Sequence, residues 1–377
     1  MRILFSHSYR TGLISKQNKF LIEIMCYEDA SNDDIQSADK IYYTTRKNRM
    51  KDLLNIIELD PPDIVILNGA MDNECLEEVS YRESIIKKGI KVFGHSEEAT
   101  KLCFNKKDTI NFLKKIHIPT IPSPNLKEGD KILPVVAKPP ESWEGYGIKI
   151  LTTMNEVQLI TDDYVLEKFI KGVELSVQAI CNKDSIVICP PVYKGVTSLK
   201  MVHPLKKLRV FPNPWNEEIN NSIIEASSRI ARELNTEGII DIDFIIQEDT
   251  FFVTEINCRA SGVTRMVSLG GINAYDIILQ ILNGKKFDLL PLVSFAVEVP
   301  IRYQLNDNEV ELLMNLDFVD YIFIRPDGNG LRQRVLLKGE TLDEIGMHVK
   351  EIFSLIAIDE PELEEILTLC EMRESYE

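Results

Sequence analysis

Two apolar runs with acidic residues in their interiors constrain the fold of this chain more than any other stretch. Residues 239–246 and 251–256 are rich in β-branched and aromatic side chains, and the polar break 247–250 separates them. This pattern predicts two antiparallel strands joined by a tight turn. A buried strand avoids charge unless the charge is paired or bound to a metal, so the acidic positions require a partner.

The acidic and amide side chains of these runs are spaced two residues apart. Asp241 and Asp243 therefore share one face of their strand, and Glu255 and Asn257 share one face of theirs. Whether the two pairs meet depends on the turn. An odd loop, such as the three residues 248–250, puts Asp243 opposite Glu255, whereas an even loop separates them unless a β-bulge intervenes.

Carboxylate and amide oxygens that converge on one face are typical ligands of Mg²⁺, which is usually also held by nucleotide phosphates. The alternative is a hairpin with one solvated acidic face, and the two strands alone do not decide between these interpretations. Residues 257–262 leave the second strand through small side chains and place Arg259 beside the proposed metal site. This continuation favours the metal site.

Bulk composition excludes several classes of protein. A length of 377 residues suggests two or three lobes, and 44% hydrophobic with 27% charged residues is ordinary for a globular protein. The net charge of −16 argues against a nucleic-acid-binding protein. Seven irregularly spaced cysteines without a CxxC pair favour reduced thiols. No apolar run approaches a signal peptide or a membrane span, so we expect a cytoplasmic protein with no membrane partner.

Residues 1–95 alternate predicted strands and helices, which indicates a small open α/β sheet. The predicted strands are 2–6, 40–44, 63–67 and 90–93, and the predicted helices are 49–59 and 73–88. The first strand is not followed by GxGxxG, so a dinucleotide site is not expected there. Domains of this kind often supply one wall of a ligand cleft, but the sequence does not fix which residues do so.

Three features of the middle of the chain are weak when taken singly. Lys106 precedes a helix, and Lys138 ends a predicted strand, 131–138, which is followed by a loop with Gly145 and Gly147. Backbone N–H groups of such a loop can cradle phosphates. Residues 164–174 predict a strand, a hinge and a second strand, an arrangement whose backbone groups suit adenine. A solvated lysine, an ordinary turn and an ordinary strand connection are the alternatives.

Taken in order, these motifs and the acidic strands resemble the ATP-grasp superfamily, which includes D-alanine–D-alanine ligase, biotin carboxylase and the carbamoyl-phosphate synthetase large chain. The resemblance covers roughly residues 60–285 well and the two ends more loosely. It implies an α/β fold with an open pre-ATP-grasp sheet, a two-lobed α+β ATP-grasp domain and a carboxy-terminal lobe. The implied domains are residues 1–95, residues 96–289 (small lobe about 108–170, central lobe 171–289) and residues 290–377.

The resemblance also implies a role for each matching residue. The expected ATP-binding residues are Lys106, Lys138, Gly145, Gly147, Glu167, Lys168, Ile170 and Glu174, with Lys168 and Ile170 acting through their backbones. The expected magnesium ligands are Asp243, Glu255 and Asn257, and Arg259 is expected to contact the transferring phosphate. The implied cofactors are ATP and Mg²⁺, with two ions, and Mn²⁺ is an alternative metal.

This chain departs from the family pattern at three positions. Asn105 stands where the family often has aspartate, and Cys258 stands where it often has proline; neither change removes an expected ligand. Asp241 occupies a position that is arginine in D-alanine–D-alanine ligase, so the details of that subgroup are not carried over. Asp241 either adds negative charge near the metals or faces solvent.

A basic segment, residues 194–213, stands out in an otherwise acidic chain. It gathers Lys200, His203, Lys206, Lys207 and Arg209. Arg209 is a candidate for binding a substrate carboxylate or the γ-phosphate, and a mobile basic loop is the alternative. Ser261 and Arg265, beyond the acidic strands, are further substrate candidates.

The carboxy-terminal part has its own predicted elements. Residues 272–283 and 342–355 are expected to be helical, and residues 293–303, 321–325 and 331–337 are expected to be strands. By resemblance, this lobe helps to wall the substrate pocket, and the family leaves a homodimer open.

Three functions remain. The first is an ATP-dependent carboxylate–amine ligase that joins small amino-acid-like substrates through an acyl phosphate and releases ADP and phosphate. The second is a phosphotransfer enzyme of the carbamoyl-phosphate type, whose bicarbonate or carbamate substrate needs no roomy pocket. The third is an ATP-binding module without turnover, which the loss of a metal ligand would indicate. Because Asp243, Glu255 and Asn257 are all present, the third function is the least favoured.

Overall fold

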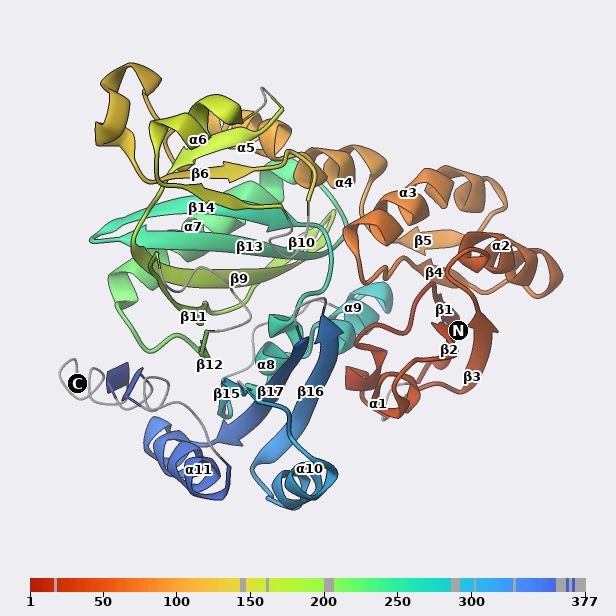
Figure 1. The fold of residues 1–377 in the computed structure, drawn as a ribbon. Helices are drawn as coiled ribbons and strands as arrows, with labels where there is room; N and C mark the ends of the chain where they lie inside the picture. The colour runs from red at the N-terminus through yellow and green to blue at the C-terminus, as the bar shows by residue number, and fades with distance from the viewer. Residues whose placement is uncertain are drawn as a thin grey trace.

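A computed structural model gives the fold and describes residues 1–16, 19–142, 147–160, 163–199, 207–285, 292–301, 303–327, 330–356, 364–365 and 368–369. The described strands form sheets of five, nine and three strands. Figure 1 shows the five-stranded sheet with its helices on one side of the molecule and the nine-stranded sheet through its centre, with the three-stranded sheet above one end of the latter. The predicted α/β fold class is confirmed.

The amino-terminal sheet is parallel throughout, in the order β3-β2-β1-β4-β5. Its strands are β1 (Arg2–Phe5), β2 (Leu21–Tyr27), β3 (Lys40–Thr44), β4 (Ile64–Ile66) and β5 (Lys91–Phe93). Helices α2 (Arg49–Leu59) and α3 (Asp72–Lys87) connect successive strands, and their apolar residues pack against the sheet. Because β1 lies between β2 and β4, the strand order reverses at β1. The carboxyl ends of parallel strands at such a reversal form a natural binding crevice.

Strand β2 was not predicted from the sequence. Its apolar run is interrupted by Glu23, which is buried at 1% exposure. Arg2 on the neighbouring strand β1 compensates the charge, with its guanidinium 2.9 Å from Glu23 Oε1, and the Tyr42 hydroxyl donates a hydrogen bond to Glu23 Oε2 at 3.1 Å. The charged residue is therefore tolerated because two neighbouring strands supply its partners.

The large sheet has the order β14-β13-β9-β11-β12-β15-β17-β16, and β10 pairs with β9 beside this path. Its first six strands in chain order are β9 (Gly172–Asn182), β10 (Ser185–Ile188), β11 (Val192–Thr197), β12 (Arg209–Phe211), β13 (Gly238–Gln247) and β14 (Thr250–Asn257). The last three are β15 (Phe295–Ile301), β16 (Val319–Asp327) and β17 (Gly330–Gly339). Since β12 pairs with β15, the carboxy-terminal strands extend the same sheet.

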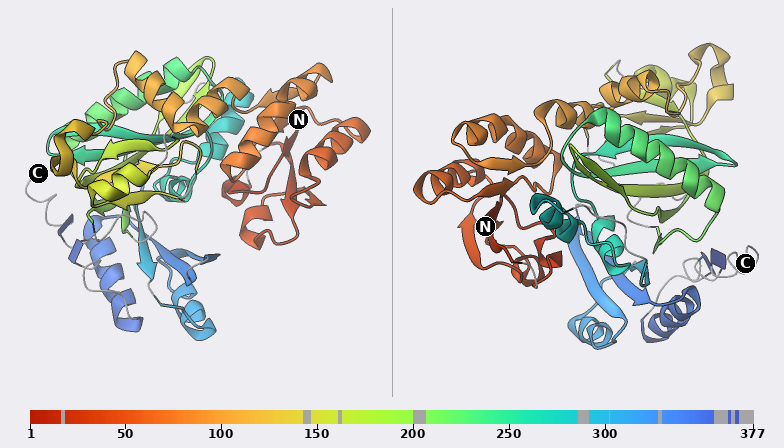
Figure 2. Two further views of the ribbon diagram at one scale, coloured as in Figure 1. Left: turned by 45° about the horizontal axis from the view of Figure 1, so that its top comes forward. Right: turned by 180° about the vertical axis from the view of Figure 1, so that it is seen from behind.

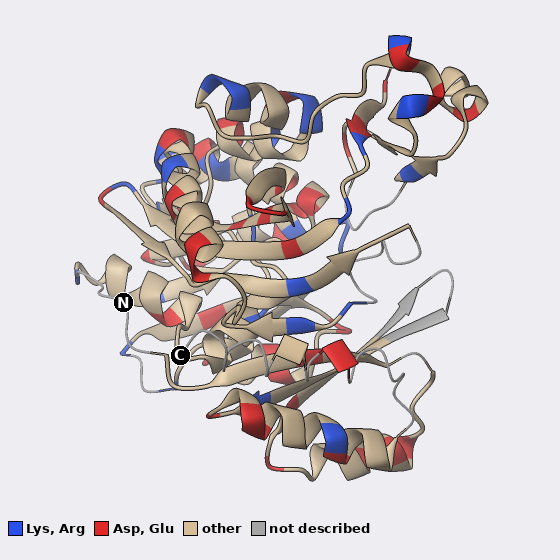
Figure 3. Cartoon of the chain, turned by 90° about the vertical axis from the view of Figure 1, so that its left-hand side faces the viewer, with Lys and Arg blue, Asp and Glu red and all other residues tan. Residues whose placement is uncertain are grey.

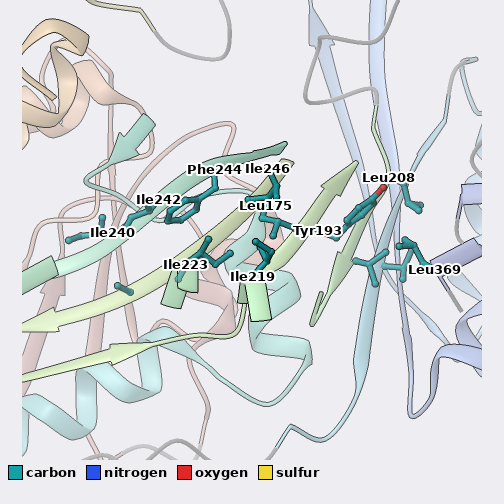
Figure 4. Close-up of a cluster of buried hydrophobic side chains, with 14 of the residues drawn as sticks. Leu175, Tyr193, Leu208, Ile219, Ile223, Ile240, Ile242, Phe244, Ile246 and Leu369 are labelled. Carbon is teal, nitrogen blue, oxygen red and sulfur yellow. The ribbon is translucent and has the colours of Figure 1, made fainter. Parts of the chain in front are cut away.

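Helix α7 (Glu217–Leu234) covers one face of the large sheet, as the view from behind in Figure 2 shows. Its buried residues Ile219 and Ile223 belong to the same apolar cluster as Leu175, Ile242 and Phe244 of strands β9 and β13, as Figure 4 shows. This helix was not predicted from the sequence, although its apolar residues follow helical spacing. On the other face, apolar residues such as Ile180 and Ile239 pack against residues 263–281.

The smallest sheet consists of β6 (Val135–Lys138), β7 (Lys149–Leu151) and β8 (Val165–Lys168), all antiparallel. The predicted strand 131–138 is wrong in its first half, because Leu126–Ile132 forms the 3₁₀ helix η2. The sheet is tied to the large sheet through the preceding loop, where Val253 N donates to Pro119 O at 3.0 Å.

The remaining described elements complete the chain. They are η1 (Thr11–Leu13), α1 (Asn32–Ile35), α4 (Glu97–Phe104), α5 (Lys106–Lys115), α6 (Met154–Leu159), α8 (Val263–Leu269), α9 (Ala274–Leu282), α10 (Asp307–Met314) and α11 (Leu342–Leu355). Within the described ranges, no helix combines the length and the apolar character that crossing a lipid bilayer requires.

Candidate active site

A β-bulge decides how the acidic residues of β13 and β14 meet. The turn between Gln247 and Thr250 has two residues, which is the even loop that would separate the acidic pairs. The register shifts by one between Phe244 and Asp243 because Thr254 is left without a partner residue on β13. Asp243 consequently lies opposite Glu255, and Asp241 lies opposite Asn257. Of the two arrangements left open by the sequence, the even loop with a bulge is the one observed.

Each of the two facing carboxylates has a lysine partner. Lys194, on β11, places its Nζ 2.5 Å from Asp243 Oδ1. Lys106, the first residue of α5, places its Nζ 3.5 Å from Glu255 Oε1 and also donates to Ser142 O at 2.8 Å. Burial raises the pKa of the Glu255 carboxyl, and the charge of Lys106 partly offsets this effect. In Figure 3, red and blue segments mark charged residues on the strands as well as on the helices.

Asp241 does not face solvent. Its side chain is 3% exposed and accepts a hydrogen bond from Ser176 Oγ at 2.5 Å. Burial, together with the neighbouring charge of Asp243, raises the pKa of the Asp241 carboxyl. The solvent-facing alternative is therefore wrong, and the residue adds acidic character to the interior of the site.

Three of the predicted adenine and phosphate residues, Lys138, Glu167 and Lys168, lie on the small sheet. Lys138, at the end of β6, places its Nζ 2.6 Å from Glu167 Oε2 on β8. Burial opposes the charge on Lys138, but Glu167 outweighs it and raises the pKa of the lysine. In the hinge, Lys168 N donates to Pro122 O at 2.9 Å, and Ile170 packs against Ile121 and Ile245.

The predicted phosphate loop is only partly described. Gly145 lies outside the described residues, as do Lys200, His203 and Lys206 of the basic segment. Gly147 has a φ of +75°, and a Cβ atom there would lie 2.8 Å from Pro139 Cγ. A side chain at this position is thus disfavoured by both the backbone conformation and the space available.

The predicted ribose carboxylate, Glu174 on β9, is held by the basic segment. Lys207 Nζ lies 2.7 Å from Glu174 Oε1, and Thr197 Oγ1 donates to the same oxygen. Lys207 is 3% exposed, and burial lowers the pKa of its ammonium group. This part of the segment is therefore an ordered part of the site rather than a mobile loop.

Arg259 connects the acidic strands to the amino-terminal sheet. Its Nε donates to Asp72 Oδ1 at 2.7 Å, and Asp72 is the first residue of α3. Burial opposes the charge on Arg259, but Asp72 outweighs it and raises the pKa of the guanidinium. Asn257 Oδ1 lies 3.5 Å from the same side chain.

The three substrate candidates have different surroundings. Arg209, on β12, pairs with Glu298 at 3.0 Å, and Ser261 Oγ accepts a hydrogen bond from Val263 N at 3.2 Å. Arg265 pairs with Asp33 and Asp320 and lies over the Tyr321 ring at 4.1 Å. Arg209 and Ser261 line the main cavity described next, whereas Arg265 is not among its lining residues.

One cavity of about 690 Å³ brings most of the predicted residues together. On it lie Lys106, Lys138, Glu167, Lys168, Ile170, Glu174, Asp243, Glu255, Asn257, Arg259, Arg209 and Ser261. The cavity continues to the carboxyl ends of β1, β2 and β3, where His7, Tyr9, Tyr27 and Arg46 line it. These residues identify the wall that the amino-terminal sheet contributes.

Three charged residues of the site were not singled out from the sequence: Lys194, Glu298 and Arg334. Lys194, Glu298 and Arg334 stand inside predominantly apolar strands, in VYKGVT, FAVEVPI and LRQRVLL. The rule that singled out Asp241 and Asp243 applies to them equally, because a charge inside a buried strand requires a partner or a ligand.

The donor set suits a hard divalent cation. Asp243 and Glu255 offer carboxylate oxygens on the cavity, Asn257 offers an amide oxygen, and Lys106 and Lys138 lie on the same cavity. No group of three or more His, Cys, Asp or Glu side chains arranged for a metal occurs in the part of the chain that the structure describes. A magnesium ion here would therefore need oxygens from Asn257 and a nucleotide as well as from the two carboxylates.

Sequence comparisons place the chain among known proteins. Residues 103–263 match the family model of the ATP-grasp domain. A carbamoyl-phosphate synthase of Methanobrevibacter smithii is 24% identical over 343 residues, which cover 86% of this chain and 91% of that protein. The carbamoyl phosphate synthase large chain of Agathobacter rectalis is 25% identical over 295 residues, but these span only 27% of its length.

Solved structures give the same fold. The L-amino acid ligase of Bacillus licheniformis superposes with a TM-score of 0.73 at 15% identity, covering 94% of this chain and 96% of that one. The biotin carboxylase domain of Hydrogenobacter thermophilus 2-oxoglutarate carboxylase, solved with MgADP and bicarbonate, has a TM-score of 0.70 at 14% identity. It covers 94% of this chain and 89% of that one. At these identities the likeness concerns the fold.

Proposed function

Since the chain carries an ATP-grasp domain and belongs to that superfamily of ATP-dependent ligases, we propose that it is a carboxylate–amine ligase. A substrate carboxylate oxygen attacks the γ-phosphorus of ATP, and the bond to the β-phosphate oxygen breaks, which yields an acyl phosphate and ADP. An amine then attacks the acyl carbon, phosphate leaves, and the amine gives up a proton. The product is an amide between two small amino-acid-like substrates.

The residues of this chain serve mainly to position and neutralise charge. Lys106 and Lys138 hold the α- and β-phosphates, the loop containing Gly145 and Gly147 covers them, and Glu174 holds the ribose. Glu167 and the backbones of Lys168 and Ile170 hold adenine. These roles follow the family pattern and fit the common cavity on which all but the two loop glycines lie.

Asp243, Glu255 and Asn257 hold the metal in this proposal, with two Mg²⁺ ions and Mn²⁺ as a substitute. Bound magnesium supplies a positive charge that offsets the charge of the transferring phosphoryl group. Arg259, oriented by Asp72, faces the transferring phosphate. Cytoplasmic location and a homodimer stay predictions.

The observation that carries the proposal is the register of one hairpin. Asp243 lies opposite Glu255, and both carboxylates line the cavity that Lys106, Lys138 and Glu174 also line. That arrangement supports ATP-dependent chemistry rather than a hairpin with a solvated acidic face. The lining of the cavity by residues at the ends of β1 to β3 supports a substrate with more atoms than bicarbonate.

A phosphotransfer enzyme of the carbamoyl-phosphate type is the second candidate. It is favoured by the relative named carbamoyl-phosphate synthase, which is matched over 91% of its length. The same cavity disfavours it, because bicarbonate or carbamate leaves the part at β1 to β3 unused. A third reading, an ATP-binding module without turnover, has no specific observation in its favour.

A turnover screen separates these readings. The full chain is incubated with ATP, Mg²⁺ and pooled pairs of amino acids, phosphate release is recorded, and products are read by mass. We expect ADP formation that depends on the substrate pair, together with the mass of a condensation product. The matched variant Asp243→Asn should show neither. ADP formation that depends on bicarbonate without a condensed mass would favour the second candidate, and ATP binding without hydrolysis would favour the third.

A further inference from the structure

Two buried arginines in the large sheet share a single carboxylate. Arg209 on β12 and Arg334 on β17 lie on the two strands that flank β15, which carries Glu298 (Figure 1). Glu298 Oε2 lies 3.0 Å from Arg209 Nη1 and 3.1 Å from Arg334 Nε. Arg209 is 6% exposed, Arg334 is 2% exposed and Glu298 is 8% exposed, and all three line the main cavity.

The charges of this group do not balance. Two guanidinium groups face one carboxylate, Glu298. Of the other acidic residues nearby, Asp241 accepts a hydrogen bond from Ser176 Oγ and forms no ion pair with Arg209 or Arg334. Asp243 pairs with Lys194, and Asp33 and Asp320 pair with Arg265. Within the group of Arg209, Arg334 and Glu298, one positive charge is thus left over, and all three side chains are buried.

The unmatched positive charge is most evident at Arg334. Its Nη2 donates to Lys207 O at 2.7 Å, but its Nη1 has no hydrogen-bond partner among the described residues. Burial and the neighbouring charge of Arg209 lower the pKa of Arg334 to about 9, although Glu298 opposes the shift. An arginine seldom loses its charge in a protein, so a buried guanidinium N–H without a partner is a strong donor for an anion.

Elsewhere the same fold balances a buried arginine. Arg49 is 1% exposed, like Arg334, but it pairs with two carboxylates, Glu78 and Glu77. The surplus at Arg209 and Arg334 is therefore not shared by every buried arginine of this chain. Because an uncompensated buried charge destabilises a protein, such a surplus points to a ligand.

We propose that Arg209 and Arg334 form an anion subsite for a carboxylate that stays ionised throughout the reaction. The reacting carboxylate loses its charge when it becomes an acyl phosphate, so a fixed guanidinium surplus suits a second, non-reacting carboxylate better. The subsite lies just past the metal strand, because Arg209 Nη1 lies 2.8 Å from the position that a Cβ atom on Gly262 would occupy. This inference rests on the proposed ligase function and narrows its substrates.

Two substrates present such a carboxylate. One is a dicarboxylic acid whose second carboxylate does not react, and the other is an amino acid that acts as the amine and keeps its own carboxylate. Bicarbonate presents none. The chemistry recognised by the subsite is the same in both cases, and the test separates the two sources.

The first measurement needs no nucleotide, metal or turnover. The thermal unfolding of the full chain is followed in increasing succinate or L-alanine, with ionic strength held constant by sodium chloride. We expect saturable stabilisation of the wild type by at least one of the two probes. Arg334→Met should weaken the apparent affinity about tenfold or more, which is the effect of losing one hydrogen bond to a charged group.

The sign of the change in stability without a ligand distinguishes a subsite from a structural ion pair. Arg334→Met removes the surplus charge, so the unliganded midpoint should stay the same or rise. Glu298→Gln doubles the surplus, so the midpoint should fall while stabilisation by the anion grows. Arg49→Met, the matched control at a balanced buried arginine, should lower the midpoint.

The proposal is overturned if neither probe stabilises the wild type, or if Arg334→Met lowers the midpoint as much as Arg49→Met and leaves the anion response unchanged. Stabilisation by succinate alone assigns the subsite to a dicarboxylic acid, and stabilisation by L-alanine alone assigns it to an amino-acid nucleophile. The ligase function is judged separately by the turnover screen. Anion binding without any condensed product would remove that function and leave the subsite in place.

Discussion

The ammonium group of Lys194 lies 2.5 Å from Asp243 Oδ1, which makes a lysine the present partner of an expected magnesium ligand. Burial opposes the charge on Lys194, but Asp243 and Asp241 outweigh it and raise the pKa of the lysine. A divalent ion bound at Asp243 would compete with this ammonium group for the carboxylate.

Replacing Lys194 should change how the free protein responds to magnesium. Lys194→Met leaves Asp243 and Asp241 without their cation, so the free energy of unfolding should fall by about 2–4 kcal/mol. Magnesium chloride alone should stabilise this variant more than the wild type, because no ammonium group competes for Asp243. Thermal and urea unfolding across a magnesium titration, without nucleotide, measures both effects.

Lys101→Met is the surface control for this experiment. Lys101 pairs with Glu97 at 2.6 Å, but the two side chains are 65% and 48% exposed. Its loss should cost less than about 1 kcal/mol and leave the magnesium response unchanged. Equal magnesium responses in Lys194→Met and the wild type would show that Lys194 does not compete with the ion.

The Lys138–Glu167 pair should separate stability from nucleotide binding. Both side chains are buried, so Lys138→Met leaves an uncompensated carboxylate and should lower the free energy of unfolding by about 3 kcal/mol. Adding Glu167→Gln should restore most of that loss but not the affinity for ATP. Urea unfolding and ATP titration calorimetry on the single and double variants give the two quantities. Recovery of ATP affinity in the double variant would argue against a phosphate-binding role for Lys138.

Stability should fall on mild acidification because two histidines are buried in their neutral form. Burial lowers the pKa of His7 and of His95 to about 4. In the unfolded chain these histidines take up protons near pH 6.5. Their contribution to the free energy of unfolding is therefore fully present above that pH and decreases as the pH falls from about 6.5 to about 4. The slope should be about 1.4 kcal/mol per pH unit for each histidine.

His95→Gln tests the sign and size of this effect. His95 Nε2 contacts Ile239 O at 2.9 Å, and a glutamine can donate to the same carbonyl. Urea midpoints between pH 7 and pH 4.5 should show a shallower decline for the variant than for the wild type. Two parallel pH profiles would mean that His95 is not held neutral by the fold.

The Asp72–Arg259 pair should matter for turnover more than for nucleotide affinity. Asp72→Asn keeps the shape of the side chain but removes the charge that orients Arg259. Once a substrate pair is known, we expect kcat to fall about tenfold while the KM for ATP changes little. Arg259→Lys, which loses the planar donor pair, should lower kcat by about 10²–10³. A rise in KM with unchanged kcat would instead assign Arg259 to ground-state binding.

Local patterns predicted several elements well. Helices Arg49–Leu59 and Leu342–Leu355 and strand Lys40–Thr44 have the predicted bounds, since their polar and apolar residues follow a single period without interruption. Strand β2 was missed because the partner of its buried Glu23 lies on another strand. Such compensation between strands is invisible to a pattern read along the chain.

For the candidate site, the sequence predicted many of the residues but not how their charges pair. Most of the residues predicted from the order of motifs line one cavity. The sequence spacing did not determine the length of the loop between Gln247 and Thr250 or the bulge at Thr254, because both depend on how the two strands pair. The pairings of Lys194, Lys207 and Arg334 with their carboxylates were not predicted, because each carboxylate lies on a strand distant in the sequence. Which charged residues pair depends on sheet order, and this order is set by the whole fold.

The continuity of the large sheet has a mechanical consequence. The strands with Asp243, Glu255, Arg209 and Arg334 are hydrogen-bonded into one array, whereas Lys138 and Glu167 stand on the separate three-stranded sheet. A movement of the three-stranded sheet relative to the large sheet would change the distance from Lys138 and Glu167 to the residues of the large sheet. The positions of Asp243, Glu255, Arg209 and Arg334 relative to one another are therefore set by one hydrogen-bonded sheet and do not depend on where the three-stranded sheet lies.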